Sequence, residues 1–332
     1  MTDSTAPVGL LIGSHIPPAD IPRLARLAED GGFAELWITE DLWFTSGIVG
    51  AGAALAATEH IPVGLGIISA VTRHVSIQAL DFATLAHIYP GRFWPGIGLG
   101  LPFWLDQMQL RPRSLLRGVG DTVSTVRDLL GGKTVTRSDT HHLDGIALAY
   151  PLDPVPPIYI GALQEKAVRQ AGRLAEGLVA SALSSPTYVR WARELVDEGA
   201  REAGVTDRRR IVTFAVFCGD EDPAAAAAAV RPTLAFYLSA VGDTALVSVY
   251  GIADELAELA EGGVERIAAE MPEQWVHDLA VTGDGEQCAA RIQALLDAGS
   301  DSVILFPAPF ERGEELVNFA ASEVLPLLRV RA

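Results

Sequence analysis

The fold is most constrained by an alternation of short apolar runs with helical patterns, which occurs eight times along the chain. The apolar runs cover residues 8–14, 36–41, 63–69, 93–100, 158–163, 178–184, 210–218 and 301–308. Apolar strands that each precede a helix predict a parallel sheet with helices outside it. A doubly wound open sheet also fits this order. Eight repeats in 332 residues favour an α/β fold of the (β/α)8 TIM-barrel type.

Two segments interrupt the alternation. Residues 133–156 are polar and predict a two-stranded excursion, and residues 235–295 predict several helices before the last strand. We expect both to be insertions in a single domain that spans residues 1–332. The sequence leaves open whether the first insertion is a lid or a scaffold.

Composition excludes several classes of function. A hydrophobic content of 49% and a charged content of 20% are typical of a soluble globular protein, and the net charge of −17 disfavours nucleic acid and anionic membranes as partners. Gly, Pro or charged residues interrupt every apolar run, and the first residues lack a signal-peptide pattern, so we expect a cytoplasmic protein. Cys218 and Cys288 are far apart in the sequence and are expected in the core.

In a barrel of this type, functional groups lie in the loops that follow the strands. These positions are rich in glycine, hydroxyl and aromatic residues, and they contain no cluster with metal-ligand spacing, no P-loop and no nucleophile elbow. We therefore predict a site for a flat organic group and a phosphate, with no metal. A metal-dependent hydrolase remains a weaker alternative.

Two glycine-containing stretches are candidates for binding such a group. Gly98 and Gly100 end one strand, but Pro102 follows where a dinucleotide fingerprint needs a helix-opening glycine. These glycines therefore either admit a planar ring or serve packing. The second stretch precedes a helix whose free N–H groups attract anions, although from chemistry alone an ordinary strand–helix turn is favoured. Its candidate residues are Gly161, Ala162, Leu163, Gln164 and Lys166.

Histidine and aromatic residues also follow the strand ends. His15, Trp43, Phe44, Phe103 and Trp104 are expected to shape an apolar pocket for a small-molecule substrate. The alternative is that these side chains belong to the core.

Four segments, in this order, resemble the luciferase-like monooxygenase family and its branch that uses the deazaflavin coenzyme F420. They are "GGFAELWITED", "VGLGIISAVTRHVSIQALDFATLAHIYPGRFWPGIGLG", "PPIYIGALQEKAVRQAGRLAEGLV" and "DLAVTGDGEQCAARIQALLDAGSDSVILFP". The resemblance implies a non-proline cis peptide bond, which falls at Gly66 and Ile67, as a bulge behind the cofactor ring. It also adds the nearby Ser69 to the cofactor-binding residues.

The chain departs from the family pattern at two positions. Many relatives have His where this chain has Asp41, and others have Glu where it has Leu101. A partly buried aspartate can act as acid or base, so we expect Asp41 to be catalytic, with the neighbouring Glu40 as a second candidate. The alternatives are a loop acid or an arginine partner for Asp41, and a cap or salt bridge for Arg73.

The resemblance implies an oxidoreductase and leaves two cofactors. With F420 the enzyme transfers a hydride to or from a small organic substrate, and we prefer this reading because "TRH" and "IYPGRF" look closer to that branch. With FMN it is a monooxygenase fed by a separate cofactor reductase. The departures also allow a non-catalytic family member. Small residues at 47–57 favour a homodimer, although the same residues could pack on the barrel.

Overall fold

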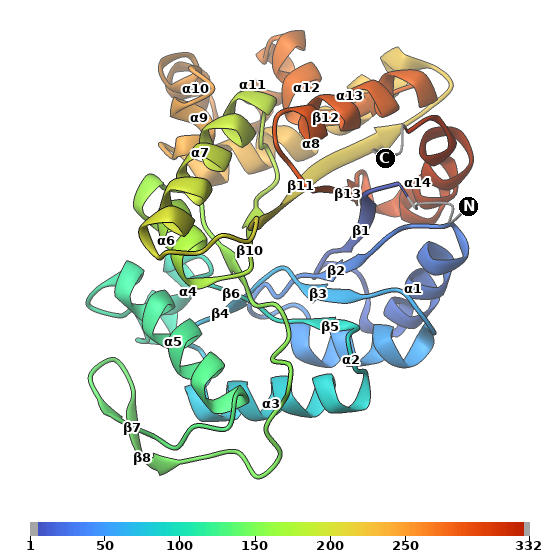
Figure 1. Cartoon of the computed structure of the whole chain (residues 1–332). Helices are drawn as coiled ribbons and strands as arrows, with labels where there is room; N and C mark the ends of the chain where they lie inside the picture. The colour runs from blue at the N-terminus through green and yellow to red at the C-terminus, as the bar shows by residue number, and fades with distance from the viewer. Residues whose placement is uncertain (1–5, 329–332) are drawn as a thin grey trace.

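The structure is a computed structural model that describes residues 6–328. Residues 1–5 and 329–332 lie outside the described residues. The expectation about a signal peptide concerns the first of these segments. Parallel strands form the centre of the molecule, and helices surround them (Figure 1). The barrel strands are β1 (Val8–Ile12), β2 (Leu36–Ile38), β3 (Val63–Leu65), β4 (Ile68–Ser69), β5 (Phe93–Trp94), β6 (Gly96–Gly98), β9 (Tyr159–Gly161), β10 (Gly177–Ala180), β11 (Arg210–Gly219) and β13 (Ser302–Pro307).

The sheet closes on itself and confirms the (β/α)8 prediction. β3 and β4 are two halves of one predicted strand, and β5 and β6 are two halves of the next. β3 pairs with β5 and β4 with β6, while β6 continues to β9, β10, β11, β13, β1, β2 and back to β3. The ring therefore contains the eight predicted strands.

The seam between these two divided strands contains a bulge. Gly64 pairs with Trp94 and Ile68 pairs with Ile97, so residues 65–67 face only residues 95–96. An extra residue on one strand bends it and increases its twist. The peptide bond between Gly66 and Ile67 in this bulge is cis, as the resemblance implies.

Helices cover the outside of the ring, and those with an apolar stripe on one face pack that stripe inward. In α1, for example, Ile21, Leu24 and Ala28 are buried at helical spacing. The other helices of this layer are α2 (Gly47–Ala57), α3 (Val75–Ile88), α4 (Pro102–Gln107), α5 (Leu115–Leu130), α6 (Glu165–Leu174), α7 (Pro186–Glu202), α8 (Pro223–Val241), α13 (Gly285–Asp297) and α14 (Gly313–Phe319), with α1 spanning Ile21–Asp30.

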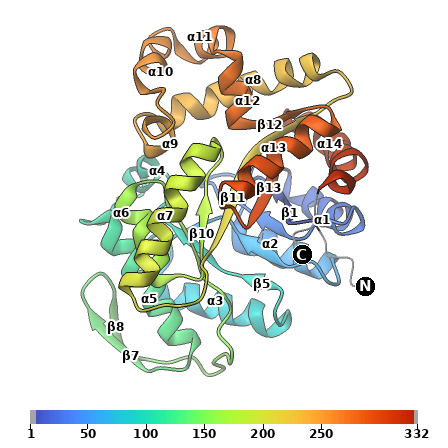
Figure 2. The ribbon, with the colours of Figure 1, turned by 45° about the horizontal axis from the view of Figure 1, so that its top comes forward.

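The two predicted interruptions have different structures. Residues 133–156 contain an antiparallel hairpin of β7 (Val135–Ser138) and β8 (His142–Ile146). The longer one contains α9 (Ala245–Ser248), α10 (Ala253–Ala260), α11 (Gly263–Glu270) and α12 (Glu273–Leu279), grouped beside α8 (Figure 2). It also contains β12 (Ala280–Gly283), a strand that the sequence analysis missed, which extends the sheet beyond β11.

Within the described part of the chain, α8 is the one helix long and apolar enough to cross a membrane by length and composition. It packs against β11, β12 and α11, and its buried residues are Ala226, Val230, Leu234, Ala235 and Leu238. The run of alanines at 224–229 lies in this helix, as alanine's high helix propensity predicts.

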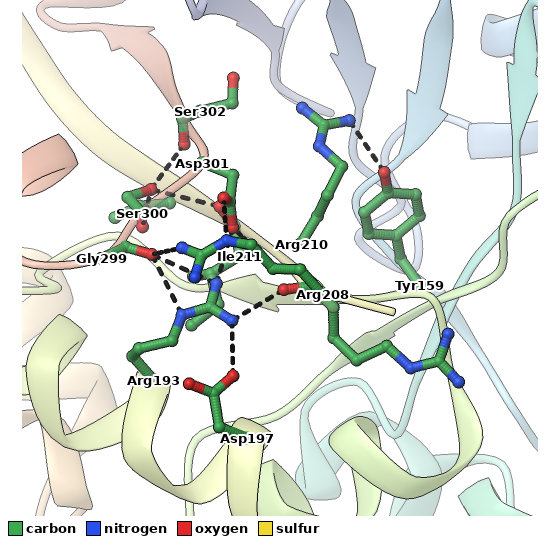
Figure 3. A network of polar contacts seen from close by, with 12 residues as sticks. Tyr159, Arg193, Asp197, Arg208, Arg210, Ile211, Gly299, Ser300, Asp301 and Ser302 are labelled. Carbon is green, nitrogen blue, oxygen red and sulfur yellow. Dashed lines mark hydrogen bonds and ion pairs between the residues drawn. The ribbon is translucent and has the colours of Figure 1, made fainter. Parts of the chain in front are cut away.

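Ion pairs fill the amino ends of the strands. The Asp301 carboxylate accepts hydrogen bonds from Arg193 (2.6 Å), Arg208 (2.8 Å) and the backbone N–H of Ile211 (2.8 Å) (Figure 3). Arg210 donates to the Tyr159 hydroxyl and to the Glu35 carboxylate, both at 2.9 Å. Each of these carboxylates has several donors, which indicates a structural role for this end of the barrel.

We predict that the barrel seam depends on Gly96. A Cβ atom at Gly96 would lie 1.7 Å from the Leu65 carbonyl oxygen, so Gly96→Ala must separate the two strands. We expect the free energy of unfolding to fall by about 2 to 3 kcal/mol, the scale of overpacking, in urea denaturation. Gly313→Ala is the control, because a Cβ at Gly313 meets nothing within 4 Å. Equal stability of the two variants would contradict this role.

Candidate active site at the carboxyl ends of the strands

The parallel strands bring the predicted site residues to one end of the barrel. His15 follows β1, Glu40 and Asp41 follow β2, and Ser69 ends β4. The glycine stretches at 98–100 and 161–166 follow β6 and β9. The structure therefore places residues that are far apart in sequence around one face, as expected for this fold.

Glu40 is committed to an ion pair. Its two carboxylate oxygens accept hydrogen bonds from the two terminal nitrogens of Arg73 at 2.6 and 2.7 Å, and one also accepts from the backbone N–H of Gly47 at 2.9 Å. The Glu40 side chain is only 3% exposed. These charge-assisted hydrogen bonds fix the loop before α2 to the loop before α3. The salt-bridge alternative for Arg73 therefore holds.

Asp41 has a different environment. The Ser14 hydroxyl donates a hydrogen bond to its Oδ2 atom, and no ion pair of Asp41 is found within residues 6–328. Burial raises the pKa of Asp41, the Ser14 hydrogen bond lowers it, and the charge of Glu40 raises it. Burial raises the pKa of Tyr237, and the charge of Asp41 raises it further. The Tyr237 hydroxyl therefore lies close enough to Asp41 to sense its charge. A partly buried carboxyl group whose pKa is raised is a candidate for proton transfer.

The bulge at Gly66 and Ile67 lies inside the ring. Both residues remain partly exposed although their neighbours in β3 and β4 are buried. A Cβ at Gly98 would lie 2.8 Å from Ile67 Cδ1, and one at Gly161 would lie 2.8 Å from Ile67 Cγ2. The two glycines therefore make room for the Ile67 side chain, which gives Gly98 and Gly161 a packing role.

Ser69 and Gly100 lie next to this bulge. Ser69 is buried, and its hydroxyl donates to the Leu99 carbonyl oxygen at 2.7 Å. Gly100 has a φ of +80°, a conformation that favours glycine, and Ser69 is the nearest residue to its position for a Cβ. The chain after β6 therefore turns sharply at this edge of the site.

The N-terminus of α6 lies on the neighbouring strand. Its N-cap residue Gln164 makes no side-chain hydrogen bond to the helix, so first-turn N–H groups remain free for an anion. Lys166 is exposed in the first turn, and the Leu163 carbonyl accepts a hydrogen bond from the buried Tyr188 hydroxyl at 3.0 Å. Ala162 is buried beneath this turn. This donor set fits a phosphate group.

The predicted pocket residues separate into buried and exposed groups. His15 stacks on Phe310 with ring centroids 3.4 Å apart, and burial lowers its pKa to about 4, so His15 is neutral at pH 7. Trp104 is 9% exposed and packs against Phe103, so it supports Phe103 from below. Trp43 and Phe44 project into solvent.

Sequence reasoning missed Tyr237 as a site residue. It comes from α8, at the start of the long helical segment, and its ring contacts Phe306 at the end of β13. No local pattern in the sequence distinguishes it from an ordinary helix residue. Among residues 6–328, no group of three or more His, Cys, Asp or Glu side chains could hold a metal ion.

Comparisons with known proteins agree with this geometry. A family model described as luciferase-like monooxygenase matches residues 2–302. The chain is 27% identical over 333 residues to a 5,10-methylenetetrahydromethanopterin reductase from Methanolobus tindarius, covering 95% of this chain and 100% of the relative. It is 28% identical over 346 residues to an F420-dependent glucose-6-phosphate dehydrogenase from Nakamurella multipartita, covering 94% and 93%.

The fold has a counterpart among solved structures. The coenzyme F420 dependent tetrahydromethanopterin reductase from Methanopyrus kandleri superimposes with a TM-score of 0.85 and 24% identity, covering 98% of this chain and 100% of that chain. The family model covers most of the chain, including all four segments that carried the resemblance up to residue 302. The chain therefore belongs to the luciferase-like monooxygenase family.

Proposed function

We propose that this protein is an F420-dependent oxidoreductase that transfers a hydride to or from a small organic substrate. The observation that carries the proposal is Asp41, a carboxylate with a raised pKa that lies at the carboxyl end of the barrel beside a partly exposed strand bulge. The names of full-length relatives, which include an F420-dependent dehydrogenase, support the choice of cofactor.

The residues present fit such a cofactor. We assign the phosphate to the free N–H groups of the α6 N-terminus and to Lys166, where no side chain caps the helix. We assign the ring to the surface formed by Gly66 and Ile67, with Ser69 and Gly100 at its edge. When bound, F420 supplies the hydride chemistry. The protein supplies binding, orientation and a proton-transferring group.

Asp41, rather than Glu40, is assigned as the acid or base. Proton transfer needs a carboxyl group that can take up and release a proton near working pH. Arg73 and the Gly47 N–H already occupy the carboxylate oxygens of Glu40, so Glu40 is a positioning residue for the Asp41 loop. Asp41 has one neutral donor, Ser14, and its proton can therefore exchange with a substrate at Oδ1.

The cofactor assignment predicts selective binding. Titration of the purified protein with F420 and with FMN, followed by cofactor fluorescence, should give saturable binding of F420 and weaker binding of FMN. Tight FMN binding without F420 binding would instead favour the monooxygenase, which also needs a separate cofactor reductase. Binding of neither cofactor would favour the non-catalytic alternative.

The Asp41 assignment predicts a split between turnover and binding. Asp41→Asn keeps the shape and removes the charge, so turnover should fall by about a hundredfold, the scale of losing a general acid or base. The dissociation constant for F420 should change by less than about twofold, because the phosphate site lies on β9 and α6. An equal loss of F420 binding and of turnover would indicate that Asp41 belongs to the surface that binds the cofactor ring.

A matched variant, Ser14→Ala, tests the same residue through its pH dependence. The Ser14 hydrogen bond stabilises the ionised Asp41 and lowers its pKa, so removing it must raise that pKa further. If ionised Asp41 is the active form, activity rises with pH through this pKa, and the midpoint should move to higher pH in Ser14→Ala. An unchanged midpoint would show that the rise of activity with pH does not report the ionisation of Asp41.

We also propose a cytoplasmic homodimer. Apolar side chains are exposed along α2 and α3, which contact each other through Gly52 and Leu85. The exposed fractions are 72% for Val49, 50% for Ile77, 49% for Leu80 and 59% for Ile88. Exposed apolar surface of this kind is typical of an interface.

The dimer proposal predicts that charge on α3 separates the subunits. Light scattering at micromolar concentration should give a dimer, and the double variant Ile77→Asp with Leu80→Asp should give a monomer. Phe236→Asp, an exposed apolar position on α8, should leave the dimer intact. A monomeric unmodified protein would exclude this interface.

A further inference from the structure

An exposed apolar rim lies at the carboxyl end of the barrel. It consists of Trp43, Phe44, Leu101 and Phe103, with exposed fractions of 68%, 64%, 41% and 53%. These residues come from two loops, one after β2 and one after β6, the second continuing into α4. Large aromatic side chains gathered in solvent on a soluble protein indicate a binding surface.

The two halves of this rim are joined to each other and to Asp41. The Trp43 indole N–H donates to the Gln107 side-chain oxygen at 3.1 Å, which links the loop after β2 to α4. The Phe44 N–H donates to the Asp41 carbonyl oxygen at 3.1 Å, so one backbone turn joins the aromatic pair to the assigned acid or base. Phe103 is supported by Trp104 at a centroid distance of 5.0 Å.

Charges around the rim do not favour an anionic substrate. Arg73 is committed to Glu40, and Arg111 forms an ion pair with Asp106 at 2.9 Å. His15 is neutral at pH 7, and Asp41 contributes negative charge when it is ionised. The hydrogen bonds and ring contacts of the rim aromatics described above all involve uncharged groups.

We infer that the substrate is an uncharged, ring-bearing apolar molecule that packs between the Trp43–Phe44 loop and Phe103. This inference rests on the proposed function, because it names the substrate class of the same site. Aromatic faces supply area and stacking without demanding a charge on the substrate. A phosphorylated substrate would instead have to reach the exposed side chains of Arg113, in the loop before α5, and Arg117, in its first turn.

The test measures binding to the F420-loaded protein by calorimetry, with acetophenone, 2-acetylnaphthalene and glucose 6-phosphate as probes. Acetophenone should bind, 2-acetylnaphthalene should bind more tightly because it buries more apolar area, and glucose 6-phosphate should not bind. Trp43→Ala and Phe103→Ala should each weaken 2-acetylnaphthalene binding by about tenfold, with F420 affinity unchanged. Tyr150→Ala, an exposed aromatic outside the rim, is the control.

Other outcomes overturn the inference. Binding of glucose 6-phosphate without either aromatic ketone would show an anionic substrate class. Ketone binding that is insensitive to both rim variants would place the apolar site elsewhere. If F420 itself fails to bind, the proposed function fails separately, and titration of the unloaded protein with 2-acetylnaphthalene still decides whether Trp43 and Phe103 bind an apolar ring.

Discussion

The close approach of two backbones at the barrel seam determines where the site can form. The Leu65 carbonyl oxygen occupies the space that a side chain at residue 96 would need, and one strand carries an extra residue across this contact. Closure of the ring therefore requires both a glycine and a bulge at this position. The bulge turns Gly66 and Ile67 toward the ring interior, and Ile67 occupies the space left by Gly98 and Gly161. Packing and the surface for a planar ring thus come from the same few residues.

Most of the fold could be predicted because each barrel strand is an apolar run followed by a helix with clear stops. Pro90 and Gly91, for example, predict the end of the helix in the third unit, and α3 ends at Ile88, two residues before Pro90. β12 was missed because it is four residues long and lies among helices. It is a strand only because the long end of β11 offers it a partner, which no local pattern indicates. The residue pairing across the seam also depends on contacts between strands that are far apart in sequence.

The sequence could predict which residues gather at the candidate site, but it could not separate their environments. Glu40 and Asp41 are adjacent and chemically alike, and their difference arises from Arg73, which is paired with only one of them. The neighbouring aromatic residues Phe103 and Trp104 likewise differ in their environments, because Phe103 is exposed to solvent and Trp104 is buried. Tyr237 reaches the site from a helix whose relation to β2 is set by the tertiary fold. A residue's position at a strand end therefore predicts that it lies near the candidate site. Its hydrogen-bond and ion-pair partners, which depend on the tertiary fold, determine what its side chain can do there.

The two ends of the barrel differ in how their polar groups are satisfied. At the amino ends, arginine side chains donate to both Asp301 and Glu35, with further hydrogen bonds from the Ile211 N–H and the Trp37 indole N–H, so these charges contribute to a fixed structure. At the carboxyl ends, the first turn of α6 is uncapped, Asp41 has a single neutral donor, and the apolar rim faces solvent. Unsatisfied donors, a carboxyl group that can titrate and exposed rings each carry a free-energy cost that a ligand can relieve. The same parallel arrangement of strands that concentrates stability at one end therefore concentrates binding capacity at the other.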